Sequence, residues 1–214
     1  MRFVMPRLYV ILDAALVEGA APEIAGQLIS AGVRLLQYRA KCLSPRETLE
    51  TARQLAERAR ARKTHFFVND RPDLAVLAGA DGVHVGQDDL SVEEARSILG
   101  RDRWVGVSTH NRQQFEQAVA TSADYVAIGP IFATTSKGNP DPVVGPALLR
   151  ELRPLTTKPI VAIGGIRLEN AAELIEAGAD SVAVIRDILA GPDPAERARQ
   201  FLACLDSARS AAHH

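Results

Sequence analysis

The sequence predicts an α/β protein folded as a single closed (β/α)8 barrel, and three observations support this. Eight short runs rich in Val, Ile and Leu recur along the 214 residues with little polar alternation, as in parallel strands covered on both faces. Helical patterns lie between these runs. Two strings, "AGADGVHV" (78–85) and "AGADSVAV" (177–184), are nearly identical, which indicates βα units repeated in series.

The predicted strands and helices follow in order along the chain. The clearest helix is predicted over 45–62, because Leu and Ala recur on one stripe and Ser44 and Glu47 form a capping signal at its start. Ser91 opens the helix after the fourth strand in a similar way, and Asp193 opens the last one. The eight strands are predicted at 8–12, 33–38, 65–69, 82–85, 104–107, 124–128, 159–163 and 181–185.

Chain length is compatible with one domain covering 1–214, with a core over about 8–205 and a frayed tail at 207–214. The length is near the lower end for a (β/α)8 barrel, so the loops must be short. An open doubly wound sheet is the main alternative. It is disfavoured because no G-x-G-x-x-G follows the first strand.

Composition restricts the classes of partner. Hydrophobic residues make up 47% of the chain and charged residues 24%, and the formal net charge is -1, so neither nonspecific nucleic-acid binding nor membrane-surface binding is supported. No window approaches a membrane span or a signal peptide. The two cysteines, Cys42 and Cys204, indicate no disulfide framework and favour a reduced, cytoplasmic location. The sequence does not determine the oligomeric state, and a homo-oligomer stays open.

Polar residues gather where the predicted strands end. A barrel brings the carboxyl ends of its strands together, so these clusters should form one site for charged oxygens and a divalent cation. The clusters are Gln37, Arg39 and Lys41 after the second strand, Asn69 and Asp70 after the third, Asp89 after the fourth, Ser108 after the fifth, Thr134, Ser136 and Lys137 after the sixth, and Gly164-Gly165 after the seventh.

Acidic and basic residues in these clusters suggest a metal and a phosphate. Asp70 and Asp89 follow neighbouring strands, and two close carboxylates repel unless a proton or a cation such as Mg²⁺ lies between them. The alternative is that both residues cap turns and helices. Arg39 and Lys41 alternate along an extended segment and could hold phosphate together, or could simply be solvated surface residues. Gln37 lies in an apolar strand and needs partners there.

Two glycine-containing segments could bind a second anion. The loop 129–138 offers hydroxyls at Thr134 and Ser136 beside Lys137, although it lacks the P-loop spacing and could be a plain connector. Gly164-Gly165 follows the seventh strand, where many barrels bind phosphate, but it could also serve close helix–strand packing.

These strings, taken together, closely resemble the thiamine phosphate synthase (thiamine-phosphate pyrophosphorylase) family over roughly residues 8–205. The strings, in order, are "LYVILD", "LQYRAK", "FFVNDRPDLA", "GADGVHVGQDDL", "VGVSTH", "YVAIGPIFATTSKG", "PIVAIGGI" and "GADSVAVI". The resemblance implies a magnesium-dependent transferase. Its substrates would be a hydroxymethylpyrimidine diphosphate and a hydroxyethylthiazole phosphate, or the carboxylated thiazole, and its products thiamine phosphate and diphosphate.

The resemblance also implies roles for individual residues. The pyrimidine diphosphate would be held by Gln37, Tyr38, Arg39, Ala40, Lys41, Asn69, Ser108 and Lys137. The thiazole phosphate would be held by Thr134, Thr135, Ser136, Gly165 and Ile185, with Arg186 as a further candidate at the same place. Mg²⁺ would be bound by Asp70 and Asp89. Catalysis would rest on charge stabilisation by Arg39, Lys41 and Lys137 and on Ser108, without a protein nucleophile.

One departure from the family pattern concerns the phosphate site. Arg186 stands where the family often has serine, and its side chain could serve phosphate or point away. A related thiazole tautomerase is one alternative, for which His110 would be the residue of interest. A non-catalytic phosphometabolite-binding barrel is the other. Both are disfavoured because Arg39, Lys41, Lys137 and the aspartate pair are retained together. His84 lies within a strand and is interpreted as a structural histidine.

Overall fold

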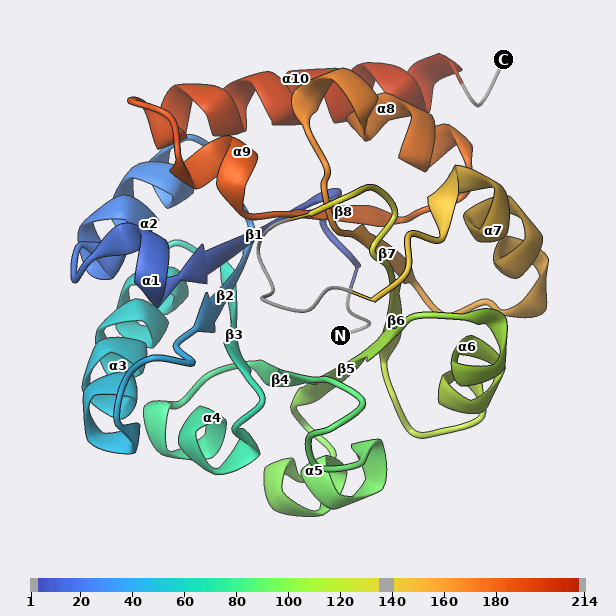
Figure 1. Cartoon of the computed structure of the whole chain (residues 1–214). Helices are drawn as coiled ribbons and strands as arrows, with labels where there is room; N and C mark the ends of the chain where they lie inside the picture. Colours follow the sequence, from blue (N-terminus) through green and yellow to red (C-terminus); the bar gives the residue numbers. More distant parts are fainter. Residues whose placement is uncertain (1–3, 135–140, 212–214) are drawn as a thin grey trace.

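The computed structural model describes residues 4–134 and 141–211. Within them, eight strands pair in parallel and in chain order, and β1 pairs with β8, so the sheet is a closed barrel (Figure 1). The predicted (β/α)8, or TIM, barrel is therefore confirmed, and each predicted strand is present with ends differing by at most two residues. The strands are β1 (Leu8–Asp13), β2 (Leu35–Arg39), β3 (His65–Asn69), β4 (Gly82–Val85), β5 (Trp104–Thr109), β6 (Tyr125–Ile128), β7 (Ile160–Ile163) and β8 (Ser181–Val184).

Helices surround the barrel as an outer ring (Figure 1). None of the helices in the described part of the chain is both long and apolar enough to cross a bilayer. The helices are α1 (Ala14–Val17), α2 (Ala21–Ser30), α3 (Pro45–Ala61), α4 (Pro72–Ala78), α5 (Val92–Leu99), α6 (Arg112–Val119), α7 (Gly145–Leu152), α8 (Leu168–Glu176), α9 (Arg186–Leu189) and α10 (Pro194–Ala211), with a 3-10 turn η1 (Arg153–Leu155) after α7.

The helix starts that the sequence predicts are all capped. At α3, Glu47 N donates to Ser44 Oγ (3.3 Å) and Ser44 N donates to the Glu47 carboxylate (2.9 Å), which completes a capping box. Ser91 forms the same arrangement with Glu94 at α5. At α10, Glu196 N donates to Asp193 Oδ1 (2.9 Å).

The repeated "AD" strings have a structural explanation. Each carries an aspartate just before an even-numbered strand, and its carboxylate accepts a hydrogen bond from the backbone of the preceding strand. Asp81 accepts from Phe66 N (2.9 Å), Asp124 from Val105 N (2.7 Å) and Asp180 from Ile160 N (2.8 Å). The repeat therefore pins the amino ends of neighbouring strands, opposite to the end where the polar clusters lie.

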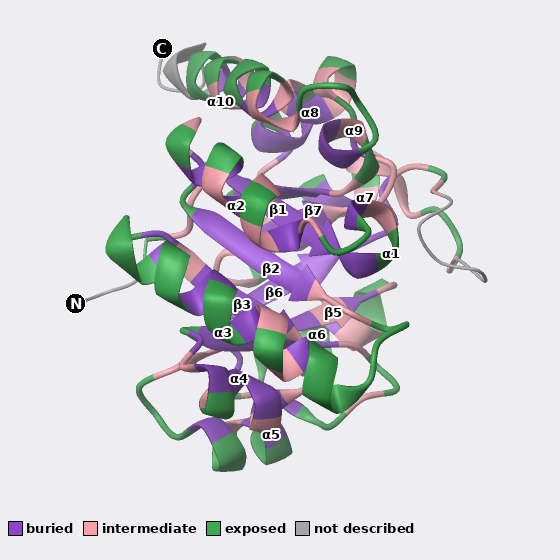
Figure 2. Cartoon of the chain, turned by 90° about the vertical axis from the view of Figure 1, so that its left-hand side faces the viewer, coloured by how far each residue is buried: buried purple, intermediate pink, exposed green. Residues whose placement is uncertain are grey.

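Side-chain alternation along the strands separates two packed layers. Outward-facing residues such as Val10, Leu36 and Val83 pack against the helices in one large core. In Figure 2 the strands are mostly coloured as buried, whereas the surrounding helices carry both buried and exposed residues. Inward-facing residues form a second, smaller cluster that fills the barrel, made of Tyr9, Ile11, Leu35, Phe67, Tyr125, Ala127, Val161 and Ala183. Side chains two residues apart on a strand point to the same face, so the polar residues at the carboxyl ends of β2 to β5 also face into the barrel.

The chain end differs from the expected frayed tail. We expected residues 207–214 to be unstructured, but α10 continues to Ala211, and 212–214 lie outside the described residues. α10 packs against α8 and α2, and Phe201, Leu205 and Ala208 are buried there. The apolar face of α10 is therefore part of the core as far as Ala208, which lies within the segment expected to be frayed.

Candidate active site

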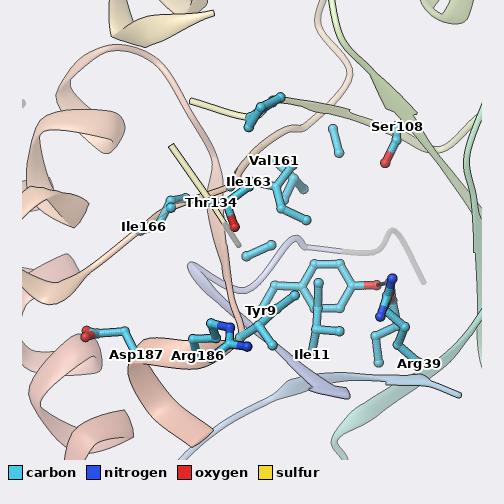
Figure 3. A pocket seen from close by; sticks show the side chains of 18 of the residues that line it. Tyr9, Ile11, Arg39, Ser108, Thr134, Val161, Ile163, Ile166, Arg186 and Asp187 are labelled. Atoms are coloured by element: carbon cyan, nitrogen blue, oxygen red, sulfur yellow. Dashed lines mark hydrogen bonds between the residues drawn. The ribbon is translucent and has the colours of Figure 1, made fainter. Parts of the chain in front are cut away.

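A cavity of about 620 Å³ opens at the carboxyl ends of the strands. This volume lies within the range of roughly 300–1,000 Å³ that is typical of small-molecule sites. Arg39 and Ser108 lie on one side of the cavity, and Ile166 and Arg186 on the other (Figure 3). The inward residues of the barrel, among them Tyr9, form its floor. The cavity thus has a polar half built from β2 to β5 and a second half built from the loops after β6 to β8.

Gln37 and Arg39 enter the polar half side by side from β2. Strand register pairs Asp13 with Arg39 across β1 and β2, and both face inward, so their side chains meet in a hydrogen-bonded ion pair. Asp13 is only 6% exposed, which makes Arg39 the counter-charge of a buried carboxylate. Gln37 is also buried, and its amide nitrogen donates to Tyr9 Oη at 2.7 Å. The partner that a buried glutamine requires is therefore present.

An acidic pair lies next to these residues, at the rim. Lys41 Nζ lies 2.8 Å from Asp70 Oδ2. Burial raises the pKa of the Asp70 carboxyl from 3.8 to about 6, and the Asp89 carboxylate beside it adds to the rise, whereas Lys41 opposes it. Asp89 in turn accepts a hydrogen bond from Gly86 N (2.8 Å). The predicted proximity of the two carboxylates is thus present, with a lysine ammonium as their neighbour.

His84 connects two inward side chains. Its Nδ1 lies 2.8 Å from Tyr125 Oη and its Nε2 lies 2.8 Å from Ser108 Oγ. His84 is 7% exposed and contributes to the cavity wall. The histidine is therefore hydrogen-bonded inside the barrel, as the structural interpretation required, and it also supports Ser108 at the cavity.

The second half of the cavity is formed by backbone as much as by side chains. Gly164 and Gly165 both have positive φ (97° and 65°), and a Cβ on either would lie within 2.5 Å of backbone atoms of the segment 130–133. Close packing therefore requires both glycines, and both also line the cavity. Arg186, at the start of α9, lines the cavity from the same side. The side chain of Arg186 therefore does not point away from the cavity.

Comparison with known proteins agrees with this geometry. The sequence profile of the family described as thiamine monophosphate synthase matches residues 8–188. The thiamine-phosphate synthase of Koribacter versatilis is 54% identical over 95% of this chain and 97% of its own length. The chain belongs to the thiamine monophosphate synthase family. The thiamine-phosphate synthase of Chloroflexus aurantiacus is 43% identical over 92% of this chain and 91% of its own length.

A solved structure supports the same assignment. Thiamine phosphate pyrophosphorylase from Pyrococcus furiosus superimposes with a TM-score of 0.86 at 30% identity, covering 94% of this chain and 96% of that one. This thiamine monophosphate synthase family member is accordingly a transferase of thiamine biosynthesis with a TIM-barrel fold.

The residues that the sequence predicted for this family member's site are not all equivalent in the structure. The cavity lining includes Gln37, Arg39, Asn69, Ser108, Thr134, Gly165, Ile185 and Arg186. The rim residues Lys41, Asp70 and Asp89 lie beside the lining rather than in it. Tyr38 faces outward into the core under the helices, and Ala40 packs partly against that core, so a substrate contact at either would involve backbone atoms. Thr135, Ser136 and Lys137 lie outside the described residues.

Sequence reasoning missed three inward residues. Asp13 ends the first strand just as the other polar residues end theirs, so the same strand-end rule would have found it. Tyr9 and Tyr125 carry buried hydroxyls that contact Gln37 and His84, respectively. Their apolar surroundings in the sequence give no signal, because only the closed barrel brings β1 and β6 face to face.

Proposed function

We propose that the chain catalyses the magnesium-dependent condensation of 4-amino-2-methyl-5-hydroxymethylpyrimidine diphosphate with 4-methyl-5-(2-hydroxyethyl)thiazole phosphate, or its carboxylated form. The products are thiamine phosphate and diphosphate. The observation that carries this proposal is a cavity of suitable size that Arg39 lines, with Lys41, Asp70 and Asp89 in contact at its rim. A diphosphate leaving group requires positive charge, which Arg39, Lys41 and a metal ion held by the two carboxylates would supply.

The acidic pair fits a divalent cation. Burial raises the pKa of Asp70 and the neighbouring Asp89 carboxylate adds to the rise, so a metal between the two carboxylates would relieve the repulsion between them. No group of three or more His, Cys, Asp or Glu ligands occurs among the described residues. A pair of carboxylates suits Mg²⁺, which is commonly bound by one or two carboxylates together with substrate phosphate oxygens. Bound there, Mg²⁺ would neutralise charge on the diphosphate.

The reaction needs bond cleavage before bond formation. The C–O bond between the pyrimidine methylene and diphosphate breaks, and its electron pair leaves with diphosphate. The electron-rich aminopyrimidine ring stabilises the positive charge that remains on the methylene, and the thiazole nitrogen then forms the new C–N bond. Arg39 and Lys41 hold the departing diphosphate, and Gln37, Asn69 and Ser108 hold the pyrimidine. No protein nucleophile takes part.

The second half of the cavity would hold the thiazole phosphate. Gly164-Gly165 brings backbone close to the ligand, while Thr134 and Arg186 contribute a hydroxyl and a guanidinium. From the resemblance alone, Thr135 and Ser136 join this phosphate site and Lys137 contacts the diphosphate.

Magnesium binding is expected to weaken at acidic pH. The pKa of Asp70 is raised to about 6, so its carboxyl is increasingly protonated below that value. Protons then compete with the metal for the carboxylate oxygens. The Mg²⁺ dissociation constant should be flat above pH 7 and should rise up to about tenfold per pH unit below pH 6. Calorimetric titrations between pH 5 and 8 would measure it. In Asp70→Asn this pH dependence should disappear, and its persistence would assign the titration to another group.

Without metal, the raised pKa of Asp70 predicts that the free energy of unfolding gains a contribution at low pH that is lost at higher pH. A carboxyl whose pKa is raised on folding favours the folded state at low pH and loses this contribution as pH rises through about 6.

Replacing Arg186 with serine is expected to raise KM for the thiazole phosphate roughly threefold to tenfold, with kcat little changed. The guanidinium lines the cavity but is exposed, so its attraction for phosphate is partly screened and should weaken further with salt. Arg199→Ser removes a similar charge on α10, where Arg199 pairs with Glu196 away from the cavity, and serves as the control. An unchanged KM for the thiazole phosphate in Arg186→Ser would remove Arg186 from the phosphate site.

The proposed function is tested by mixing the purified protein with both substrates, with and without Mg²⁺, and measuring thiamine phosphate and diphosphate. Release of both products in equal amounts, only with Mg²⁺, is the expected result. Absence of product from folded protein with Mg²⁺ would overturn the proposal.

A further inference from the structure

A continuous line of hydrogen bonds crosses the floor of the cavity inside the barrel. Gln37 Nε2 donates to Tyr9 Oη (2.7 Å), Tyr9 Oη lies 3.1 Å from Tyr125 Oη, and Tyr125 Oη lies 2.8 Å from His84 Nδ1. His84 Nε2 then lies 2.8 Å from Ser108 Oγ. Five side chains from β1, β2, β4, β5 and β6 thus form one chain whose two ends, Gln37 and Ser108, both line the cavity.

This chain of hydrogen bonds has a preferred direction, because the amide nitrogen of Gln37 at its first end can only donate. Tyr9 accepts a hydrogen bond from Gln37, so the arrangement that places every hydroxyl proton within the chain has Tyr9 donating to Tyr125. In that arrangement Tyr125 would donate to His84 Nδ1, and the ring would carry its proton on Nε2 and donate it in a hydrogen bond to Ser108. In this direction each hydroxyl donates once and accepts once within the chain. The reverse direction would make Tyr9 accept twice and leave its own proton without a place in the chain.

The fold protects this arrangement. Burial raises the pKa of both the Tyr9 and the Tyr125 hydroxyl well above the usual value, so both retain their protons. Gly106 lies between His84 and Tyr125 in the strand register, and a Cβ there would lie 2.0 Å from Tyr125 Cζ. The missing side chain lets the Tyr125 ring stack on His84 at 5.6 Å between centroids.

We propose that Tyr9 and Tyr125 are positioning residues that hold His84 as its Nε2–H tautomer, so that the Ser108 hydroxyl is free to donate into the cavity. Ser108 accepts from His84 and therefore presents its own proton to the ligand. The group that it recognises must be an acceptor, such as an unprotonated ring nitrogen of a heteroaromatic substrate. Only the identity of that ligand as the pyrimidine rests on the proposed function.

Nuclear magnetic resonance of protein labelled with ¹⁵N-histidine tests the direction of the chain. The shifts of the two ring nitrogens show which one carries the proton, and the His84 signals are identified by their loss in His84→Gln. The expected result for the unmodified protein is a proton on Nε2 and an accepting Nδ1. A proton on Nδ1 would overturn the proposal. This measurement needs no activity, so it remains decisive even if the proposed reaction is not observed.

Variants test whether the chain acts on Ser108. In Tyr125→Phe, we expect a mixture of His84 tautomers and a roughly tenfold lower kcat/KM for the pyrimidine diphosphate, with KM for the thiazole phosphate unchanged. Thr109→Val is the matched control, because it removes a buried hydroxyl one residue from Ser108 that faces outward and donates to Ala127 O (2.8 Å). It should keep the tautomer and the kinetics.

A second variant covers the case in which Tyr125→Phe does not fold. Tyr9→Phe leaves the bond from Tyr125 to His84 in place, so the Nε2 tautomer should persist with a smaller loss of kcat/KM. An unchanged kcat/KM for the pyrimidine diphosphate in Tyr9→Phe, or wild-type tautomer and kinetics in folded Tyr125→Phe, would contradict the proposal.

Discussion

Replacing Arg39 with alanine is expected to lower kcat/KM on the order of a hundredfold or more. The guanidinium lines the cavity, and in the proposed reaction it would hold the departing diphosphate. The change should also destabilise the protein by about 2–3 kcal/mol, because it leaves the Asp13 carboxylate buried without its partner. This estimate is below the value for fully buried pairs because the Arg39 side chain is 19% exposed. Steady-state kinetics and denaturant unfolding measure the two effects.

A double variant separates the two roles of Arg39. In Arg39→Ala combined with Asp13→Asn, the orphaned charge is gone, so most of the lost stability should return while activity stays low. Arg39→Lys retains the charge but not the bidentate guanidinium and should fall between wild type and Arg39→Ala. Near-normal activity in the double variant would show that Arg39 acts only by neutralising Asp13.

Replacing Asp89 with asparagine should raise the Mg²⁺ concentration for half-maximal activity on the order of a hundredfold. Asparagine retains a carbonyl that can accept the hydrogen bond from Gly86 N but removes the negative charge that the proposed metal site would require. Removing that charge should also lower the pKa of Asp70, because Asp89 contributes to the rise. Magnesium titrations of activity and a carbon-detected titration of Asp70 measure the two effects.

Asp88→Asn provides the matched control for the aspartate pair. Asp88 is the exposed neighbour of Asp89, so its substitution removes the same charge one residue away. Both the magnesium requirement and the titration of Asp70 should stay as in the wild type. If Asp88→Asn and Asp89→Asn shifted the magnesium requirement equally, the effect would be a general one of local charge rather than metal ligation.

The sequence by itself determined the architecture. Strand positions, the capped starts of α3, α5 and α10, and the gathering of polar residues at one end depend on local patterns: apolar runs, capping residues and the βα repeat. These signals act within a few residues, so they can be recognised without knowing what packs against what. The closed barrel then follows from eight such units in series.

Only the tertiary structure decided which polar groups meet. The ion pair between Asp13 and Arg39 depends on the register of β1 against β2, and the contact between Tyr9 and Tyr125 joins residues 116 positions apart across the barrel. Tyr38 was predicted with its neighbours, but the strand pleat turns its side chain away from the cavity. Hydrogen bonds and ion pairs act over a few ångströms and depend on direction, so partners distant in sequence are set by the closure and register of the sheet.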